Sequence, residues 1–222
     1  MKLLLNALIF FIKIIFPQCC LICGKNCNDI WCEECKNWIN LNILLRIDTN
    51  FNDKLYFDKK IHIFQYKDKI RNLILDYKFK DKSYLYKIFA EIIIKNKKIC
   101  RILKSYDIII PVPIHKKRKN ERGYNQSELI AKKIALGIEN LTFENRIIKK
   151  RINNKKQSML NREERRRNVE NVYELINNEK IINKKIILFD DIYTTGCTVN
   201  EIAKLLKNNG AKEVLVLTIA KD

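Results

Sequence analysis

The sequence lacks the features of an exported or membrane-spanning protein. Its first segment, MKLLLNALIFFIKIIFPQCC, combines a basic residue with an apolar run, but Lys13 interrupts the run and no small-x-small cleavage site follows. The run is also too short to cross a bilayer. We expect residues 3–16 to form an apolar helix that Pro17 ends. It would pack on the main domain or lie on a membrane surface, and we favour packing because its polar face is thin. The predicted location is therefore cytoplasmic, with a peripheral membrane position as the alternative.

Acidic residues are scarce relative to basic ones. The 222 residues include 25 Asp and Glu against 44 Lys and Arg, which gives a formal net charge of +19. A positive potential attracts phosphates and other polyanions. The basic residues are spread along the chain, however, so the charge alone is weak support for nucleic-acid binding. The length fits one domain plus a small module, and 47% hydrophobic residues are enough for a packed core.

Eight cysteines are expected to be thiols or metal ligands, because disulfides are rare in a reducing cytoplasm. Four of them form two C-x-x-C pairs, and thiolates at this spacing can close a tetrahedron around Zn²⁺. These four are Cys20, Cys23, Cys32 and Cys35. Four protein ligands leave no position for water, so the zinc would be structural and its binding energy would fold the module. Cys19 and Cys27 are possible substitute ligands, and the alternative to a metal site is a set of redox or small buried thiols.

Hydrophobic patterning predicts an α/β fold with a parallel sheet flanked by helices. The expected strands are residues 61–66, 106–113, 186–189 and 213–220, with 143–152 as a further candidate. The expected helices are residues 69–80, 83–96, 127–136 and 199–209, the second of them capped by Ser83.

The segment KIILFDDIYTTGCTVNE carries most of the functional information. Its apolar strand delivers Asp190 and Asp191 at the carboxyl end, which is where ligands bind in open α/β sheets. In the following turn, Gly196 allows a close backbone approach or a positive φ. The N–H groups at the start of the next helix favour an anion such as a phosphomonoester. The carboxylates would repel that phosphate, so they are expected to accept hydrogen bonds from ribose hydroxyls or to hold Mg²⁺.

A purely structural interpretation of this turn is also available. Thr198 and Glu201 have the spacing of a capping box, in which a hydroxyl and a carboxylate satisfy the first N–H groups of a helix. The combination of strand, acidic pair and threonine-rich turn favours the sugar-phosphate site over this alternative.

A basic segment, residues 115–122, follows the other buried strand. Beyond it, Asn125 and Glu128 have capping-box spacing and are expected to open a helix. The two strand-loop-helix units place an acidic loop and a cationic loop at one edge of the sheet. A sugar between two phosphate groups would bridge them, whereas a basic loop standing alone would be an ordinary solvated loop.

The motif DDIYTTG resembles the fingerprint of the type I phosphoribosyltransferases, which bind phosphoribosyl pyrophosphate (PRPP). The chain resembles the ComF family in the segment PVPIHKKRKNERGYNQSE and in the spacing of the four cysteines. The resemblance implies a type I phosphoribosyltransferase-like domain at residues 46–222. It is preceded by residues 1–45, which hold the apolar helix and a small zinc module with four cysteines. It implies that Asp190 and Asp191 face the ribose. The implied 5′-phosphate contacts are Thr194, Thr195, Gly196 and Thr198, with Cys197 in a variable place between them. The implied pyrophosphate contacts are Arg118 and Arg122, with backbone from Val112 and Pro113 onward.

Residues 153–168 are polar and highly charged, so they cannot bury a core and are expected to move. Here the chain resembles ComF proteins at Gln157, Arg162 and Arg166, among others. The resemblance implies a loop that closes over the substrate. The alternative is a surface loop that contacts nucleic acid or nothing.

The preferred hypothesis is a phosphoribosyltransferase that binds Mg²⁺ and PRPP and acts on an acceptor that the sequence does not identify. By resemblance to ComF proteins it is linked to DNA uptake in natural transformation. The second hypothesis is a non-catalytic accessory protein that responds to PRPP or binds single-stranded DNA, with proteins of the competence machinery as partners.

Overall fold

The computed structural model describes residues 18–49, 51, 55–154 and 162–222. The helix expected at residues 3–16 lies outside these residues. The chain divides into two compact units, Met1–Ile43 and Leu44–Asp222, which we describe separately. The domain boundary expected after residue 45 stays a prediction. In the part of the chain that the structure describes, no helix is long and apolar enough to cross a membrane.

The first unit is a turn structure followed by one helix. Cys19 and Asn26 form an isolated antiparallel bridge, and the Gly24 N–H donates to the Cys20 carbonyl at 2.9 Å. Gly24, directly after Cys23, has a φ of +77°, a conformation that glycine adopts readily in a tight turn. Helix α2, Glu33–Asn42, begins directly after Cys32. Cys20, Trp31 and Ile39 are buried, which is a small core for an independent module.

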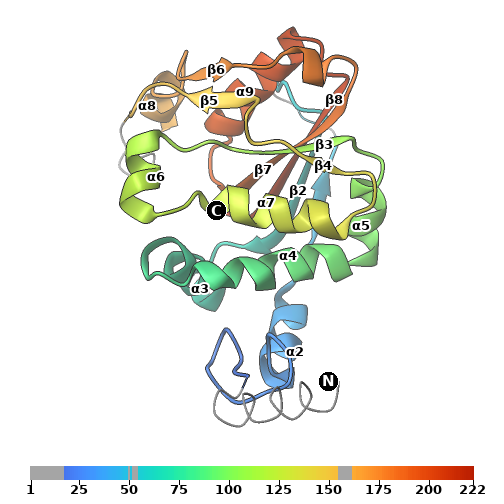
Figure 1. Cartoon of the computed structure of the whole chain (residues 1–222), viewed down its shortest axis with the longest axis vertical. Coiled ribbons are helices and arrows are strands. Elements are labelled where there is room, and N and C mark those ends of the chain that lie inside the picture. The colour runs from blue at the N-terminus through green and yellow to red at the C-terminus, as the bar shows by residue number, and fades with distance from the viewer. Residues whose placement is uncertain (1–17, 50, 52–54, 155–161) are drawn as a thin grey trace, which may run out of the picture. The chain divides into compact units, whose positions relative to one another are not determined.

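The second unit is built on a six-stranded sheet with the order β1-β2-β8-β7-β3-β4 (Figure 1). Strand β1 is antiparallel to β2, and the other neighbours are parallel. The strands are β1 Arg46–Asp48, β2 Lys59–Gln65, β3 Ile108–Pro111, β4 Thr142–Phe143, β7 Lys185–Tyr193 and β8 Glu213–Lys221. Residues 186–189 of β7 are fully buried, as a strand covered on both faces requires.

Helices cover both faces of this sheet (Figure 1). One layer contains α3 Asp68–Phe79, α4 Tyr86–Lys95, α5 Lys97–Leu103 and α7 Gln126–Gly137. The other layer contains α9 Cys197–Asn208, α8 Arg162–Arg167 and the two-stranded sheet of β5 Ile148–Lys150 and β6 Tyr173–Leu175. Alternate residues of β7 follow this division, because Ile186 and Leu188 pack in the cluster that includes α9 whereas Ile187 and Phe189 do not. The expected α/β fold with a parallel sheet flanked by helices is confirmed.

Three local expectations were wrong. Ser83 does not cap a helix but begins a short 3₁₀ turn, Ser83–Leu85, that leads into α4. The basic segment after β3 is not a loop: it forms helix α6, Lys116–Arg122, which the His115 side chain caps by accepting from the Lys117 N–H at 3.2 Å. Residues 143–152 do not form one strand, because β4 ends at Phe143 and β5 belongs to the separate sheet.

The N-terminus of α7 forms half of the expected capping box. The Asn125 side chain accepts from the Ser127 N–H at 3.2 Å. The Glu128 carboxylate instead accepts from Lys119 Nζ at 2.9 Å and from Asn145 Nδ2 at 2.8 Å. Glu128 therefore ties α7 to α6 and to the segment after β4.

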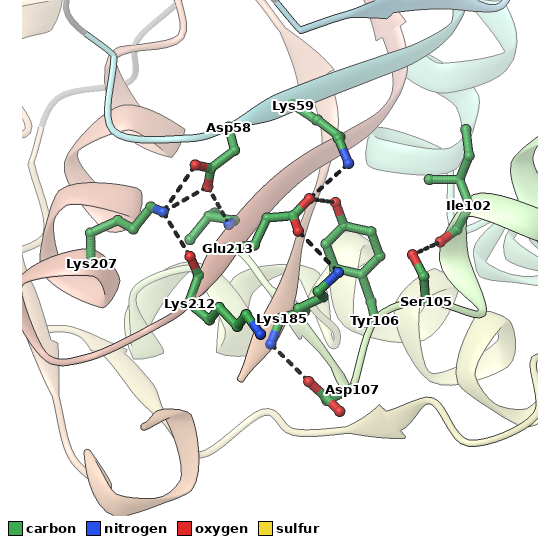
Figure 2. Close-up of polar contacts among 11 residues, drawn as sticks. Asp58, Lys59, Ile102, Ser105, Tyr106, Asp107, Lys185, Lys207, Lys212 and Glu213 are labelled. Carbon is green, nitrogen blue, oxygen red and sulfur yellow. Dashed lines mark hydrogen bonds and ion pairs between the residues drawn. The ribbon is translucent and has the colours of Figure 1, made fainter. Parts of the chain in front are cut away.

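An ion network joins the strands at the rim where β7 and β8 begin (Figure 2). Glu213 accepts from the Tyr106 hydroxyl at 2.6 Å and from Lys59 Nζ at 2.9 Å, and it lies 3.3 Å from Lys185 Nζ. Burial opposes ionisation of Glu213, but these three partners outweigh it and hold its pKa at about 2. The Glu213 carboxylate therefore has a structural role. The expected site lies at the opposite rim of the sheet.

Candidate functional site

Strand β7 leads directly into the turn that was expected to hold a phosphate. Helix α9 begins at Cys197, and its N-cap is Gly196 with a φ of +78°. A Cβ at Gly196 would lie 2.2 Å from the Tyr193 hydroxyl oxygen, so both the backbone conformation and the packing require glycine. Thr198 is thus the second residue of the helix and cannot be the N-cap of a capping box with Glu201. Gly196 itself has no side chain to cap the helix.

Asp190 lies inside β7, half-buried and one residue beyond the last pairing with β3, and not at the end of the strand as expected, because β7 continues beside β8 to Tyr193. Its Oδ1 atom accepts from the Ser127 hydroxyl at 3.2 Å and from the Asp191 N–H at 2.9 Å. Burial, followed by the negative charge of Asp191, raises the pKa of Asp190 to about 7, against the opposing effect of Lys78. The carboxyl group therefore changes its charge near neutral pH.

Asp191 has a different partner. Its Oδ2 atom lies 2.9 Å from Lys78 Nζ, and the two side chains are 14% and 16% exposed. Lys78 comes from the last turn of α3, which sequence reasoning treated only as part of an amphipathic helix. No sequence pattern pairs residue 78 with residue 191, so this contact was missed.

The segment between β3 and α7 carries the two arginines expected at the pyrophosphate arm. Arg118 donates to the Asn154 carbonyl, and burial and the charge of Arg122 lower its pKa. Arg122 donates to Gln126 Oε1 at 3.1 Å, and its guanidinium lies 5.0 Å from the centroid of the Phe79 ring. Both arginines are held by contacts within the protein.

Val112 lies directly after β3 in the turn that includes Pro113. The Val112 N–H donates to the Phe189 carbonyl at 2.8 Å, and the Val112 carbonyl accepts from Asn125 Nδ2 at 3.1 Å. Both polar backbone groups of Val112 thus have partners inside the protein. This arrangement fixes the segment after β3 against the middle of β7, at Phe189.

Strands β5 and β6 contribute a lysine and a tyrosine that sequence reasoning missed. Lys150 Nζ lies 5.6 Å from the centroid of the Tyr173 ring. Burial, followed by the charge of Arg118, lowers the pKa of Lys150 to about 8, and Asp190 opposes this shift. Burial also raises the pKa of Tyr173, whose neighbours include Asp190 and Arg118. Lys150 and Tyr173 therefore lie within electrostatic range of both the acidic pair and the cationic segment.

The structure describes two of the three residues that were expected in the closing loop. Gln157 lies outside the described residues. Arg162 and Arg166 lie in the short helix α8, in a segment that was expected to be a loop. Their role in closure over a substrate stays a prediction.

The four predicted metal ligands come together in the first unit. The Sγ atoms of Cys20, Cys23, Cys32 and Cys35 all lie within 4.8 Å of one another. Those of Cys23 and Cys32 are 3.7 Å apart. The cluster can bind a metal ion such as zinc.

The two additional cysteines have other contacts. Cys27 Sγ donates to the Asp29 carbonyl at 3.0 Å, and Cys19 Sγ donates to Asn26 Oδ1 at 3.3 Å. Neither belongs to the group of four sulfurs. The geometry therefore selects the two C-x-x-C pairs over the substitute ligands.

Comparison with known proteins agrees with this architecture. Residues 125–222 match the model of the phosphoribosyl transferase domain family. Competence protein F of Haemophilus influenzae is 32% identical over 171 residues, which cover 74% of this chain and 73% of that protein. Competence protein ComFC of Streptococcus pneumoniae is 33% identical over 72% of this chain and 66% of its own length.

Among solved structures, a purine phosphoribosyltransferase from Pyrococcus horikoshii is similar, with 13% identity, coverage of 63% of this chain and 85% of that chain, and a TM-score of 0.41. The expected fold, a phosphoribosyltransferase-like sheet with an N-terminal four-cysteine module, is confirmed. Given the match to Competence protein F over most of both chains, this protein belongs to the ComF family.

Proposed function

We propose that this protein binds PRPP together with Mg²⁺ at the carboxyl rim of its sheet and transfers the phosphoribosyl group to an acceptor that is not yet identified. The observation that carries the proposal is the construction of β7. This one strand delivers Asp190 and Asp191 and then, through Gly196, the start of α9. The hydroxyls of a phosphorylated sugar can donate hydrogen bonds to the two carboxylates. Its phosphate can accept hydrogen bonds from the N–H groups at the start of α9.

Each part of the ligand has a group of partners in this proposal. The 5′-phosphate would contact the first turn of α9 and the hydroxyls beside it. The residues are Thr194, Thr195, Gly196, Cys197 and Thr198. Asp190 and Asp191 would accept hydrogen bonds from the ribose hydroxyls, and Arg118 and Arg122 would meet the pyrophosphate beside the turn at Val112 and Pro113.

The donor set of the acidic pair fits Mg²⁺, because this ion prefers carboxylate oxygens together with substrate phosphates. When bound, Mg²⁺ would neutralise charge on the departing pyrophosphate. The protein's own contribution is position and fixed charge, since positive charge develops at the anomeric carbon close to the carboxylates. Closure of the segment with Gln157, Arg162 and Arg166 would exclude water. No single acid or base is required by this chemistry.

The acidic pair gives the first test. In isothermal titration calorimetry with PRPP and Mg²⁺, Asp190→Ala/Asp191→Ala should bind PRPP about 100-fold more weakly than wild type. Two charge-assisted hydrogen bonds of about 1.5 kcal/mol each are lost. The matched control is Glu170→Ala/Glu179→Ala, which removes two exposed carboxylates. Absence of heat with wild type, or equal heat with the acidic-pair variant, would reject the assignment.

The raised pKa of Asp190 predicts a pH dependence of PRPP binding. Below pH 7 the carboxyl group is protonated and can accept fewer hydrogen bonds from ribose hydroxyls. Affinity should therefore rise by roughly tenfold between pH 6 and pH 8, as the ionised fraction grows. Since PRPP itself titrates, the measured quantity is the difference between wild type and Asp190→Asn. A difference that does not change with pH would contradict the prediction.

We further propose that the four-cysteine cluster holds structural Zn²⁺. Four sulfur ligands within 4.8 Å of one another suit a closed tetrahedral site. Burial raises the pKa of Cys35, whereas backbone N–H groups outweigh burial at Cys20 and lower its pKa to about 6. A bound cation would stabilise the thiolate form of all four.

Metal analysis tests this site. Purified protein should contain about one Zn²⁺ per chain, and Cys32→Ser should lose it, because three ligands bind structural zinc far more weakly. Cys27→Ser, which changes a thiol outside the cluster, should keep the metal. Zinc retained in Cys32→Ser, or lost in Cys27→Ser, would show that the ligand set is different.

A second candidate function is a non-catalytic accessory role in competence, with single-stranded DNA or competence-machinery proteins as partners in the cytoplasm. The relatives named as competence proteins and the net charge of +19 favour it.

If phosphate contacts dominate, the logarithm of the binding constant for an oligonucleotide should fall linearly with the logarithm of salt concentration, by about 0.7 per contact. Fluorescence anisotropy measures this slope. An affinity that does not depend on salt concentration, or no binding at low salt, would argue against single-stranded DNA as the partner. Pyrophosphate release with trial acceptors separates it from the transferase.

A further inference from the structure

The carboxylate of Asp191 already has a cation of its own. Lys78 Nζ lies 2.9 Å from Asp191 Oδ2, and both side chains are mostly buried. An exposed ion pair contributes little to stability, whereas removal of one partner from a buried pair leaves an uncompensated charge. Lys78 and Asp191 therefore satisfy each other's charge.

The backbone of Lys78 is held in place by its neighbour in the helix. Tyr77 is 1% exposed, and its hydroxyl donates to the Gln126 carbonyl at 2.8 Å. The Tyr77 carbonyl accepts from the Tyr124 hydroxyl. These two bonds fix the end of α3 to the start of α7. A change of partner by the ammonium therefore requires rotation of the Lys78 side chain and not movement of α3.

A ligand at Asp191 must compete with this ammonium. A divalent cation on the same carboxylate would lie close to this ammonium, and the repulsion between the two positive charges would weaken its binding. A lysine side chain is a compact charge on a flexible stem and can turn to another anion. The phosphates of an incoming ligand would provide that anion.

We propose that Lys78 is the internal counter-ion of the acidic pair: it competes with a divalent cation for Asp191 and is displaced when the phosphorylated ligand binds. The proposal deepens the function proposed above and rests on its placement of the ligand at Asp190 and Asp191. It assigns a role in the site to a lysine of α3, 113 positions before its partner in the sequence.

Mn²⁺ binding without PRPP tests this role directly. The free ion is measured by electron paramagnetic resonance on the zinc-loaded full chain at pH 8, where Asp190 is ionised. Lys78→Met should bind Mn²⁺ at least about tenfold more tightly than wild type, because the competing charge is gone. Lys78→Arg keeps the charge and should stay weak. Lys87→Met, a change at an exposed lysine of α4, should match wild type.

A double variant locates the effect. The tighter binding of Lys78→Met should be lost in Lys78→Met/Asp191→Asn. If Mn²⁺ binds equally to wild type and Lys78→Met, or if the double variant keeps the gain, the proposal is overturned. Circular dichroism checks the fold, and Lys78→Gln replaces Lys78→Met if the latter unfolds. Unfolding of both would assign Lys78 to stability and would also overturn the proposal.

The outcome is independent of the calorimetry with PRPP. A gain in Mn²⁺ affinity without any PRPP heat in wild type would support the counter-ion and reject the proposed ligand. PRPP binding without a gain in Mn²⁺ affinity would support the proposed ligand and would overturn the role of Lys78 as counter-ion.

Discussion

The pairing of β3 with β7 is the constraint on which the site depends. The two strands run parallel in the register Ile108–Ile186 to Pro111–Phe189, and the Val112 N–H continues the ladder to the Phe189 carbonyl. The cationic segment leaves from one strand and the acidic pair from the other. A shift of one residue would exchange the faces of β7 and would move Asp190 away from Ser127. Because both faces of residues 186–189 are covered, such a shift would force Ile186 and Leu188 to exchange packing partners with Ile187 and Phe189, and the misfit disfavours it.

The parts of the fold that sequence could predict are those governed by local chemistry. The apolar run of β7, the glycine at residue 196 and the spacing of the cysteines each require a particular residue type at a particular place. The φ of +78° at Gly196 and the contact that a Cβ would make with Tyr193 show why no other residue fits there. The four sulfurs within 4.8 Å likewise follow from a defined spacing, which places the first C-x-x-C pair on a turn and the second at the start of α2.

The parts that sequence could not predict depend on contacts between distant segments. Lys78 and Lys150 have the appearance of ordinary surface lysines in an amphipathic helix and in a charged strand. Their surroundings come from Asp191 and from Arg118, Tyr173 and Asp190, which only the folded chain brings near them. The basic segment 115–122 was expected to be a loop because it follows a buried strand and a turn that contains proline. His115 as an N-cap and the bond between Lys119 and Glu128 support a helix there instead.

The two ends of the sheet differ in how far they can rearrange. At the end where β7 and β8 begin, the single carboxylate of Glu213 joins residues of β2, β7 and the segment before β3 (Figure 2). Four chain segments, with β8 as the fourth, thus converge on one anion. Loss of the Glu213 carboxylate would remove the common partner of Lys59, Lys185 and Tyr106 and would loosen the sheet at the rim opposite the acidic pair.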